Sequence, residues 1–150
     1  MNTQTVPTLD LARYLGKWYE IARFDHKFER NMVGNMADYS LQKNGMIKVV
    51  NSAWLYNLQG QYKTAIGKAK QVDPAEPGKL KVAFFLWFYA DYYIFELGEN
   101  YEYAVVGSSS PNYLWILSRT KTMDQSILDG ILGRLGKRGY EVSKFIFVTQ

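Results

Sequence analysis

The residues that could do chemistry are few and lie far apart in the sequence. The chain has no cysteine and one histidine, His26. The missing thiols exclude disulfide bonds, thiolate nucleophiles and cysteine-ligated metals, and the lone histidine leaves a histidine metal site or a catalytic triad without partners. The Gly-x-Ser-x-Gly sequence of a nucleophile elbow is also absent. The sequence therefore predicts no catalytic residue, no metal site and no cofactor.

Two features keep an enzyme acting on an apolar substrate as an alternative. Residues 108–110 are three consecutive serines, but no histidine or lysine base lies near them in the sequence. Glu20 and Glu96 would form a carboxylate pair if both faced one interior, and paired carboxylates serve in general acid–base catalysis. A glutamate on a strand more often lies at a rim or points outward, so the sequence favours binding over catalysis.

A small cationic group, made of His26, Lys27 and Arg30, could receive an anion. The three residues lie close together in one segment, and cations of this kind suit the phosphate or carboxylate head of a ligand. His26 could also serve as an axial ligand of haem, which keeps tetrapyrrole binding as a second alternative. A lone histidine in a loop is, however, more often a surface residue.

Length and composition predict a single domain, residues 1–150, that does not bind nucleic acid. A chain of 150 residues can bury a sizeable core without a metal or a disulfide. The 18 Lys and Arg exceed the 14 Asp and Glu by four, and no element concentrates them as in nucleic-acid-binding domains. No segment approaches the ~18–20 apolar residues of a membrane span, and the first ten residues lack a signal-peptide core, so the chain as written is expected to be soluble.

Most of the chain reads as short strands separated by turn residues. Apolar and aromatic residues alternate with polar ones, and Asn-Gly, Pro and Gly signals interrupt them at the spacing typical of barrels and sandwiches. Short connections between consecutive strands favour an all-β, eight-stranded up-and-down antiparallel barrel. The predicted strands are 16–25, 34–42, 46–54, 61–72, 79–85, 91–97, 103–108 and 113–119.

The ends of the chain add further elements. Residues 1–15 are expected to hold an N-terminal segment with a turn of helix, and residues 16–119 the barrel. A capping box with Thr122 as N-cap and Gln125 begins a helix over 122–138, and 141–149 is expected to form a last strand. Apolar residues at helical spacing predict one stripe that packs on the barrel, with the three glycines of this helix on its far side. The stripe is Ile127, Leu128, Ile131, Leu132 and Leu135.

Two short motifs carry a resemblance to a known family. A Gly-x-Trp sequence, Gly16 and Trp18, begins the first predicted strand, and Arg119 ends the eighth. With the helix and strand that follow, this order resembles the lipocalin family and, within it, the bacterial lipocalins of the outer membrane. The family's central Thr-Asp-Tyr motif is present only in part, at residues 98–101. The longest matching segments are 15–30, 114–120 and 142–148.

The resemblance implies a non-catalytic carrier that stores or transports an amphiphilic lipid, a fatty acid or a lysophospholipid, in an apolar barrel cavity. It also implies a place at the periplasmic face of the bacterial outer membrane, although the chain has no cysteine that a lipid could modify. Membrane contact and a homodimer are the further partners that it implies.

The same resemblance separates a structural lock from a ligand-binding interior. Gly16, Trp18 and Arg119 are expected to close the barrel base, with the guanidinium on the indole ring and its donors on carbonyls of the N-terminal turn. Alternation along each strand then gives the inward-facing residues. The ligand-binding set is Tyr39, Val49, Ala65, Gly67, Ala69, Val82, Phe84, Tyr92, Ile94, Val106, Tyr113 and Trp115.

Within this set, small residues face large ones. Ala65, Gly67 and Ala69 follow one another on one inner wall, and aromatic or branched residues line the others. A small wall opposite large side chains predicts empty volume for an elongated apolar guest. The alternative is that side chains of facing walls interdigitate and leave no cavity.

The loops at the open end are expected at 25–32, 54–60, 86–90 and 109–112. The first carries His26, Lys27 and Arg30, so these cations are the candidate head-group site. The third lies in an aromatic run, and we expect Trp87, Phe88 and Tyr89 to form an exposed apolar lip. Such a patch normally marks a contact surface, here with a membrane or a second copy of the chain.

Overall fold

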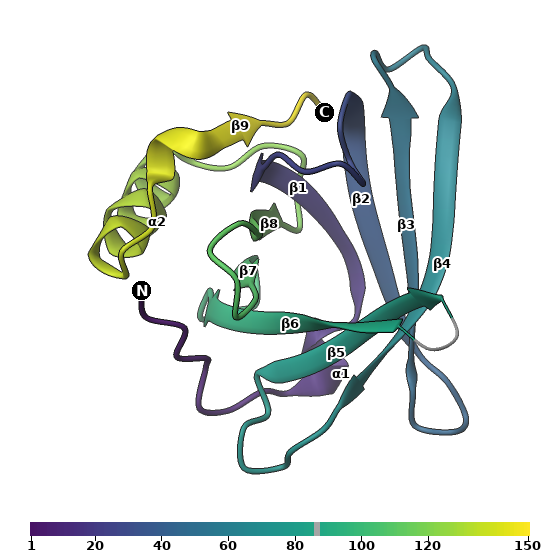
Figure 1. Ribbon diagram of the computed structural model, residues 1–150, viewed down its shortest axis with the longest axis vertical. Coiled ribbons are helices and arrows are strands. Elements are labelled where there is room, and N and C mark those ends of the chain that lie inside the picture. The colour runs from purple at the N-terminus through teal and green to yellow at the C-terminus, as the bar shows by residue number, and fades with distance from the viewer. Residues whose placement is uncertain (86–87) are drawn as a thin grey trace.

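A computed structural model describes residues 1–85 and 88–150. It confirms the predicted eight-stranded antiparallel barrel, in which each strand pairs with its neighbours in sequence and β1 closes the barrel on β2 and β8 (Figure 1). The strand bounds differ from the prediction by three residues at most. The strands are β1 Gly16–Phe24, β2 Met32–Leu41, β3 Ile47–Leu55, β4 Tyr62–Gln71, β5 Lys79–Phe85, β6 Phe88–Leu97, β7 Tyr103–Gly107 and β8 Leu114–Ser118.

The largest difference in bounds is at the start of β6, which begins at Phe88 instead of residue 91. The backbones of Phe85 and Phe88 pair in register, so residues 88–90 of the expected 86–90 loop belong to the strand. Tyr89 lies within β6, and the ammonium of Lys70 lies 4.5 Å from its ring centroid. The other two residues of the expected lip, Trp87 and the side chain of Phe88, fall outside the described part of the chain.

The barrel opens along one side. β4 pairs with β5 only from Lys68 to Gln71, so its first six residues have no partner on that side among the described residues. In Figure 1, β2, β3 and β4 stand side by side as one wall, while β5 and β6 cross below them. Because interior residues near this opening are not covered, solvent reaches part of the inner wall of β4.

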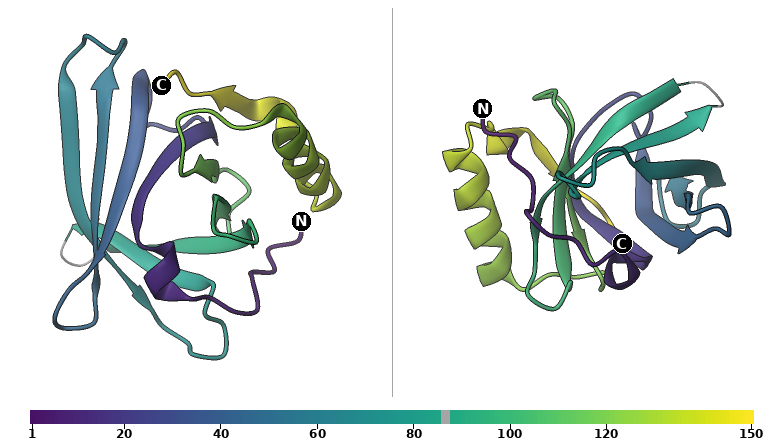
Figure 2. Two further views of the ribbon diagram at one scale, coloured as in Figure 1. Left: turned by 180° about the vertical axis from the view of Figure 1, so that it is seen from behind. Right: turned by 90° about the horizontal axis from the view of Figure 1, so that it is seen from below.

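The helix α2, Gln125–Lys137, packs on the outside of the barrel opposite this wall (Figure 2). Its buried residues confirm the predicted stripe, because Leu128, Ile131 and Leu135 join a core with the outer faces of β1, β6, β7 and β8. Ile127 lies at the edge of the stripe and is 39% exposed. Neither this helix nor the four-residue α1, Leu11–Tyr14, has the length and apolar character that a membrane span requires.

The predicted N-cap of α2 is wrong. Asp124, not Thr122, caps the helix, and its carboxylate accepts a hydrogen bond of 2.8 Å from the backbone N–H of Ser126. The carbonyl of Thr122 instead accepts a bond from the Thr120 hydroxyl, which holds residue 122 in the preceding turn. A carboxylate immediately before the first helical residue is a strong cap and overrides the threonine two positions earlier.

The last predicted strand is also wrong in its first half. Residues Val142–Lys144 form a 3-10 turn, and only Phe145–Phe147 form the strand β9, which pairs with the end of β1. The chain then continues along the barrel wall: Val148 N–H donates to the Ile21 carbonyl, and Gly34 N–H donates to the Thr149 carbonyl. The C-terminus therefore lies between β1 and β2, where these strands separate toward the mouth.

Candidate ligand-binding site

The base of the barrel is closed by Trp18 and Arg119. The guanidinium carbon of Arg119 lies 3.7 Å from the Trp18 ring centroid, and Trp18 is fully buried. Gly16 lies next to this guanidinium with a φ of +97°, a conformation that suits glycine alone. The guanidinium donates to four backbone carbonyls that span the N-terminal turn and the loop between β6 and β7. These belong to Arg13, Leu15, Lys17 and Tyr101.

Above this base, the inner faces of the strands form one apolar cluster. It combines branched side chains with tyrosines and with Trp115, and it is separate from the core beneath α2. Alternation along the strands therefore placed most of the expected ligand-binding residues on the inside. Those found in this cluster are Tyr39, Val49, Ala69, Val82, Tyr92, Ile94, Val106 and Trp115.

The expected small wall on β4 is not an uninterrupted face of the cavity. Ala69 is buried, but Ala65 is exposed, because it lies nearer the mouth, in the part of β4 that does not pair with β5. At Gly67 the Phe84 ring takes the place of a side chain, since a Cβ there would lie 2.7 Å from a ring carbon. The Phe84 ring from the neighbouring strand therefore covers the glycine at this position.

The lower barrel is nearly filled. A pocket of about 10 Å³, the space of one water molecule, lies between α1 and the inner faces of β2 to β6. Three hydrogen-bonded tyrosines line this pocket: the Tyr92 hydroxyl oxygen lies 2.5 Å from that of Tyr14 and 2.9 Å from that of Tyr39. Burial raises the pKa of all three phenols, so they remain neutral donors and acceptors at physiological pH.

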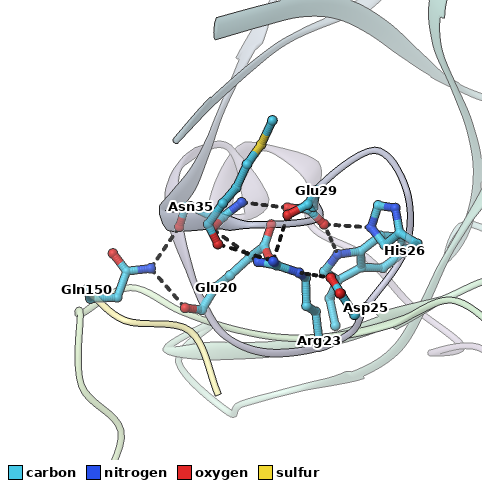
Figure 3. A network of polar contacts seen from close by, with 9 residues as sticks. Glu20, Arg23, Asp25, His26, Glu29, Asn35 and Gln150 are labelled. Carbon is cyan, nitrogen blue, oxygen red and sulfur yellow. Dashed lines mark hydrogen bonds and ion pairs between the residues drawn. The ribbon is translucent and has the colours of Figure 1, made fainter. Parts of the chain in front are cut away.

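Near the mouth, the loop after β1 turns a carboxylate into the barrel. The Oε1 atom of Glu29 accepts hydrogen bonds from the Trp115 indole at 2.8 Å and from His26 Nε2 at 2.7 Å. Its Oε2 atom accepts one from the Asn35 amide at 2.9 Å. Figure 3 shows this carboxylate at the centre of a network of polar side chains. Because Trp115 belongs to the inner cluster, the network borders the barrel interior.

A buried arginine supports the loop that carries Glu29. Arg23 is 1% exposed, and its guanidinium donates to the Glu29 carbonyl at 2.7 Å and to the Met32 carbonyl at 3.2 Å. It also donates to the Asn35 side-chain oxygen at 3.1 Å. Gln150 bonds the Glu20 and Asn35 carbonyls, which joins the C-terminus to the same network (Figure 3). The positions of the loop and of Asn35 are thus fixed together.

The pKa values of two carboxyl groups in this network, Glu20 and Glu29, are shifted in opposite directions. Burial and then the negative charge of Glu29 raise the pKa of Glu20 well above its usual value. Burial alone would raise the pKa of Glu29 too, but hydrogen bonds from Glu20, His26 and Trp115, with the charge of Arg23, lower it to about 2. The folded protein therefore holds a proton on Glu20 to a higher pH than on Glu29.

The expected cationic head-group site is not assembled. His26 points inward to Glu29 and packs edge-on against Tyr113 and Trp115, with ring centroids 5.5 Å apart in both cases. The Arg30 guanidinium instead lies 3.9 Å from the Asp25 carboxylate at the surface, and Lys27 lies over the exposed Phe28. The expectation that His26 is a surface residue is wrong, because its side chain is 10% exposed.

The carboxylate pair imagined between Glu20 and Glu96 is also absent. Glu96 points outward and binds Arg134 of α2, with Nη2 to Oε1 at 2.9 Å. The carboxyl group whose charge acts on Glu20 is that of Glu29, which the sequence reasoning missed because Lys27 and Arg30 made its loop read as cationic. The available signal was the spacing of His26 and Glu29, since residues three apart in a turn can face the same side.

The serine run at residues 108–110 bonds within its own turn and to Asp91 of β6. The Ser108 hydroxyl donates to the Ser110 carbonyl at 3.3 Å, and the Ser109 hydroxyl bonds Asp91. In the described chain none of these hydroxyls has His26 as a hydrogen-bond partner, so no serine–histidine pair is formed there. The described part of the chain also contains no group of three or more metal-ligating side chains that could hold an ion.

Comparison with protein families and curated sequences gives one consistent match. The profile of the family described as "Lipocalin-like domain" matches residues 9–150. The chain is 42% identical over 150 residues to the outer membrane lipoprotein Blc of Vibrio cholerae, covering 99% of this chain and 87% of that protein. It is 41% identical to Blc of Escherichia coli K12, covering 97% and 81%, and 34% identical to temperature-induced lipocalin-1 of Arabidopsis thaliana, covering 94% and 79%.

Solved structures share the fold at much lower identity. Insecticyanin from the tobacco hornworm Manduca sexta superposes with a TM-score of 0.80 at 21% identity, covering 100% of this chain and 85% of that one. The cockroach allergen Per a 4 gives a TM-score of 0.78 at 20% identity, covering 100% and 94%. These two comparisons support the barrel architecture alone.

Proposed function

The chain belongs to the lipocalin family, whose members bind small hydrophobic ligands, and from this premise we propose that it carries a single-chain amphiphilic lipid without transforming it. A fatty acid or a lysophospholipid fits this description. The acyl chain would lie among the inner apolar side chains, and the polar head would lie near the mouth.

The observation that carries this proposal is the apolar inner cluster above a closed base. Trp18 and Arg119 seal one end, and Val82, Val106 and Trp115 supply apolar surface between that end and the mouth. Micromolar affinity corresponds to about 8 kcal/mol, so at ~0.8 kcal/mol per buried methylene an acyl chain must bury more than about ten methylenes to reach it once the costs of binding are met. The narrow base pocket implies that the chain lies in the upper barrel, and the unpaired part of β4 is the natural side for its entry.

We also propose that the protein acts at the bacterial outer membrane. The two bacterial relatives compared here are named outer membrane lipoproteins, and they cover nearly all of this chain. Contact with a lipid surface and pairing of two copies are part of this proposal, because either would bring the mouth close to a source or acceptor of lipid.

Titration with a fluorescent fatty-acid analogue tests the proposal. We expect saturable binding of one probe per chain and its displacement by an unlabelled fatty acid. Ala65→Trp should weaken binding, because Ala65 lies on the inner face of the unpaired part of β4. Ile66→Ser is the control, because Ile66 is the next residue along β4 and its side chain is 62% exposed and faces outward. Absence of saturable binding to the wild-type protein would overturn the proposal.

A further inference from the structure

We propose that the donors around the Glu29 carboxylate form a receptor for the carboxylate head of a fatty acid, which Glu29 itself fills when no ligand is bound. This inference rests on the proposed lipid-binding function and makes it more specific. It names a residue of the chain that the ligand must displace.

The first support is the geometry of the receptor. Trp115, His26 and Asn35 converge on the two oxygens of one carboxylate at 2.7–2.9 Å. Two of the three donors come from strands, β8 and β2, so they stay in place if the loop moves. A planar carboxylate from any source would satisfy the same three donors, whereas an alcohol has one oxygen and would leave a buried donor unpaired.

The second support is unused polar capacity beside the carboxylate. Glu20 Oε1 and His26 Nδ1 are buried and have no hydrogen-bond partner within the described chain. Buried polar atoms are nearly always bonded in folded proteins, so each of these two atoms retains capacity for a further polar partner. Glu29 therefore satisfies this site incompletely, as expected of a substitute for the group that the site binds.

The third support is the location. Trp115 and Tyr39 are members of the inner cluster, and the charges of Glu20 and Glu29 contribute to the raised pKa of the Tyr39 phenol. The carboxylate thus borders the space in which an acyl chain would lie. The positive charge of Arg23, 3.6 Å from Glu20, favours an anion at this position, and the raised pKa of Glu20 reduces the negative charge that would oppose one.

Exchange of the two carboxylates needs only a local movement. Glu29 lies in the loop between β1 and β2, and apart from its carboxylate this loop is held by Arg23 through backbone carbonyls. A fatty acid that enters the barrel with its head toward Trp115 would take over the three donors, and the Glu29 side chain would turn to solvent. The competition between two anions for one receptor predicts that Glu29 lowers the affinity for fatty acids selectively.

The test compares a fatty acid with the alcohol of the same chain length, by displacement of a neutral fluorescent probe at pH 7.5. Glu29→Ala empties the receptor, so the affinity for the acid should rise about tenfold, while that for the alcohol changes little. Glu76→Ala removes one negative charge from an exposed loop at the closed end and should leave both affinities unchanged. Adding Trp115→Phe to Glu29→Ala should abolish most of the gain.

Stability provides a second measurement on the same variant. Glu29→Ala leaves three buried donors unpaired, so its melting temperature should fall and should be restored by the acid more than by the alcohol. If Glu29→Ala does not fold, Glu29→Gln tests the same point, because an amide is a weaker acceptor for these donors. Equal changes in acid and alcohol affinity, or none, would overturn this inference alone. Wild-type protein that binds neither compound would instead overturn the proposed function.

Discussion

The Glu29 carboxylate lies 2.8 Å from the indole nitrogen of Trp115, although 86 residues separate the two in the sequence. This bond ties the loop at the mouth of the barrel to the inner wall of β8. Because Trp115 also faces the apolar cluster, the bond connects the polar network of Figure 3 with the candidate ligand-binding space. Several properties that can be measured depend on this network and on the closed base below it.

Removing the ring at the base should destabilise the protein strongly. Trp18→Ala leaves a large void beneath a fully buried position and should lower the free energy of unfolding by ~3–5 kcal/mol. Arg119→Ala should cost less, because its guanidinium is partly exposed. The double variant should lose less than the sum of the two, since the groups are in contact. Urea denaturation of all four proteins measures this, and strict additivity would contradict the contact.

The two buried carboxyl groups should give opposite dependences of stability on pH. The raised pKa of Glu20 means that the folded protein holds a proton that the unfolded chain releases above about pH 4.5. Folding is therefore penalised as the pH rises from 4.5, and Glu20→Gln should remove this penalty. The variant should be at least as stable as the wild type at pH 7, with an advantage that shrinks toward pH 4.

Glu29→Gln should behave in the opposite way. The pKa of Glu29, lowered to about 2, stabilises the folded state above pH 4.5, and this stabilisation is lost as the pH falls toward 2. The variant should be less stable than the wild type at pH 7 by ~1–3 kcal/mol, and the difference should narrow in acid. Urea titrations of both glutamine variants at pH 4 and pH 7 test the pair. Parallel behaviour of the two would show that the protonation states are assigned wrongly.

Replacements along the inner face of β4 should separate its packed and open parts. Ala69 is 4% exposed and borders the small base pocket, so Ala69→Trp should overpack the core and cost ~1–3 kcal/mol or more. Ala65 lies four residues earlier on the same face, where β4 pairs with β3 but not with β5, so Ala65→Trp should cost little. Thermal melts of the two variants decide this, and similar losses would place Ala65 in a packed interior.

The cap of α2 provides a test that is independent of ligand. Asp124→Ala removes the carboxylate that accepts the Ser126 N–H and should lower stability by ~0.5–2 kcal/mol. Thr122→Ala should have a smaller effect, because the Thr122 side chain does not cap the helix. Chemical denaturation of both variants compares the two positions, and a larger loss for Thr122→Ala would identify the earlier capping box as the true one.

The sequence predicted the strands of the barrel well, because the signals that define a strand lie within the strand itself and the turns beside it. Alternation with period two and strong turn signals define each strand, and the family resemblance carried by Gly16, Trp18 and Arg119 implied the closed base. The same alternation placed Tyr39, Val106 and other residues on the inner wall. It failed on β4, because alternation says which face a side chain is on but not whether the neighbouring strand covers that face.

The polar network could not be predicted in the same way. Glu29 reaches Trp115 only because its loop adopts one particular conformation, which includes a positive φ of 66° at Asn31 and the bonds from buried Arg23. A single sequence does not show whether the side chain of a charged loop residue is exposed to solvent or buried. The three cations near Glu29 therefore suggested a surface site, whereas the structure turns one of them, His26, inward.

The position of a bound acyl chain tests the central claim most directly. Nuclear Overhauser effects between an isotope-labelled fatty acid and the methyl groups of the protein report which side chains lie within a few ångströms of the chain. The account predicts contacts with the methyls of Ala65 and Val106, on inner faces toward the mouth, and none with the outward-facing Ile66. Contacts with Ile66 and other outer methyls, in the absence of any to the inner cluster, would contradict the assignment of the barrel interior as the binding site.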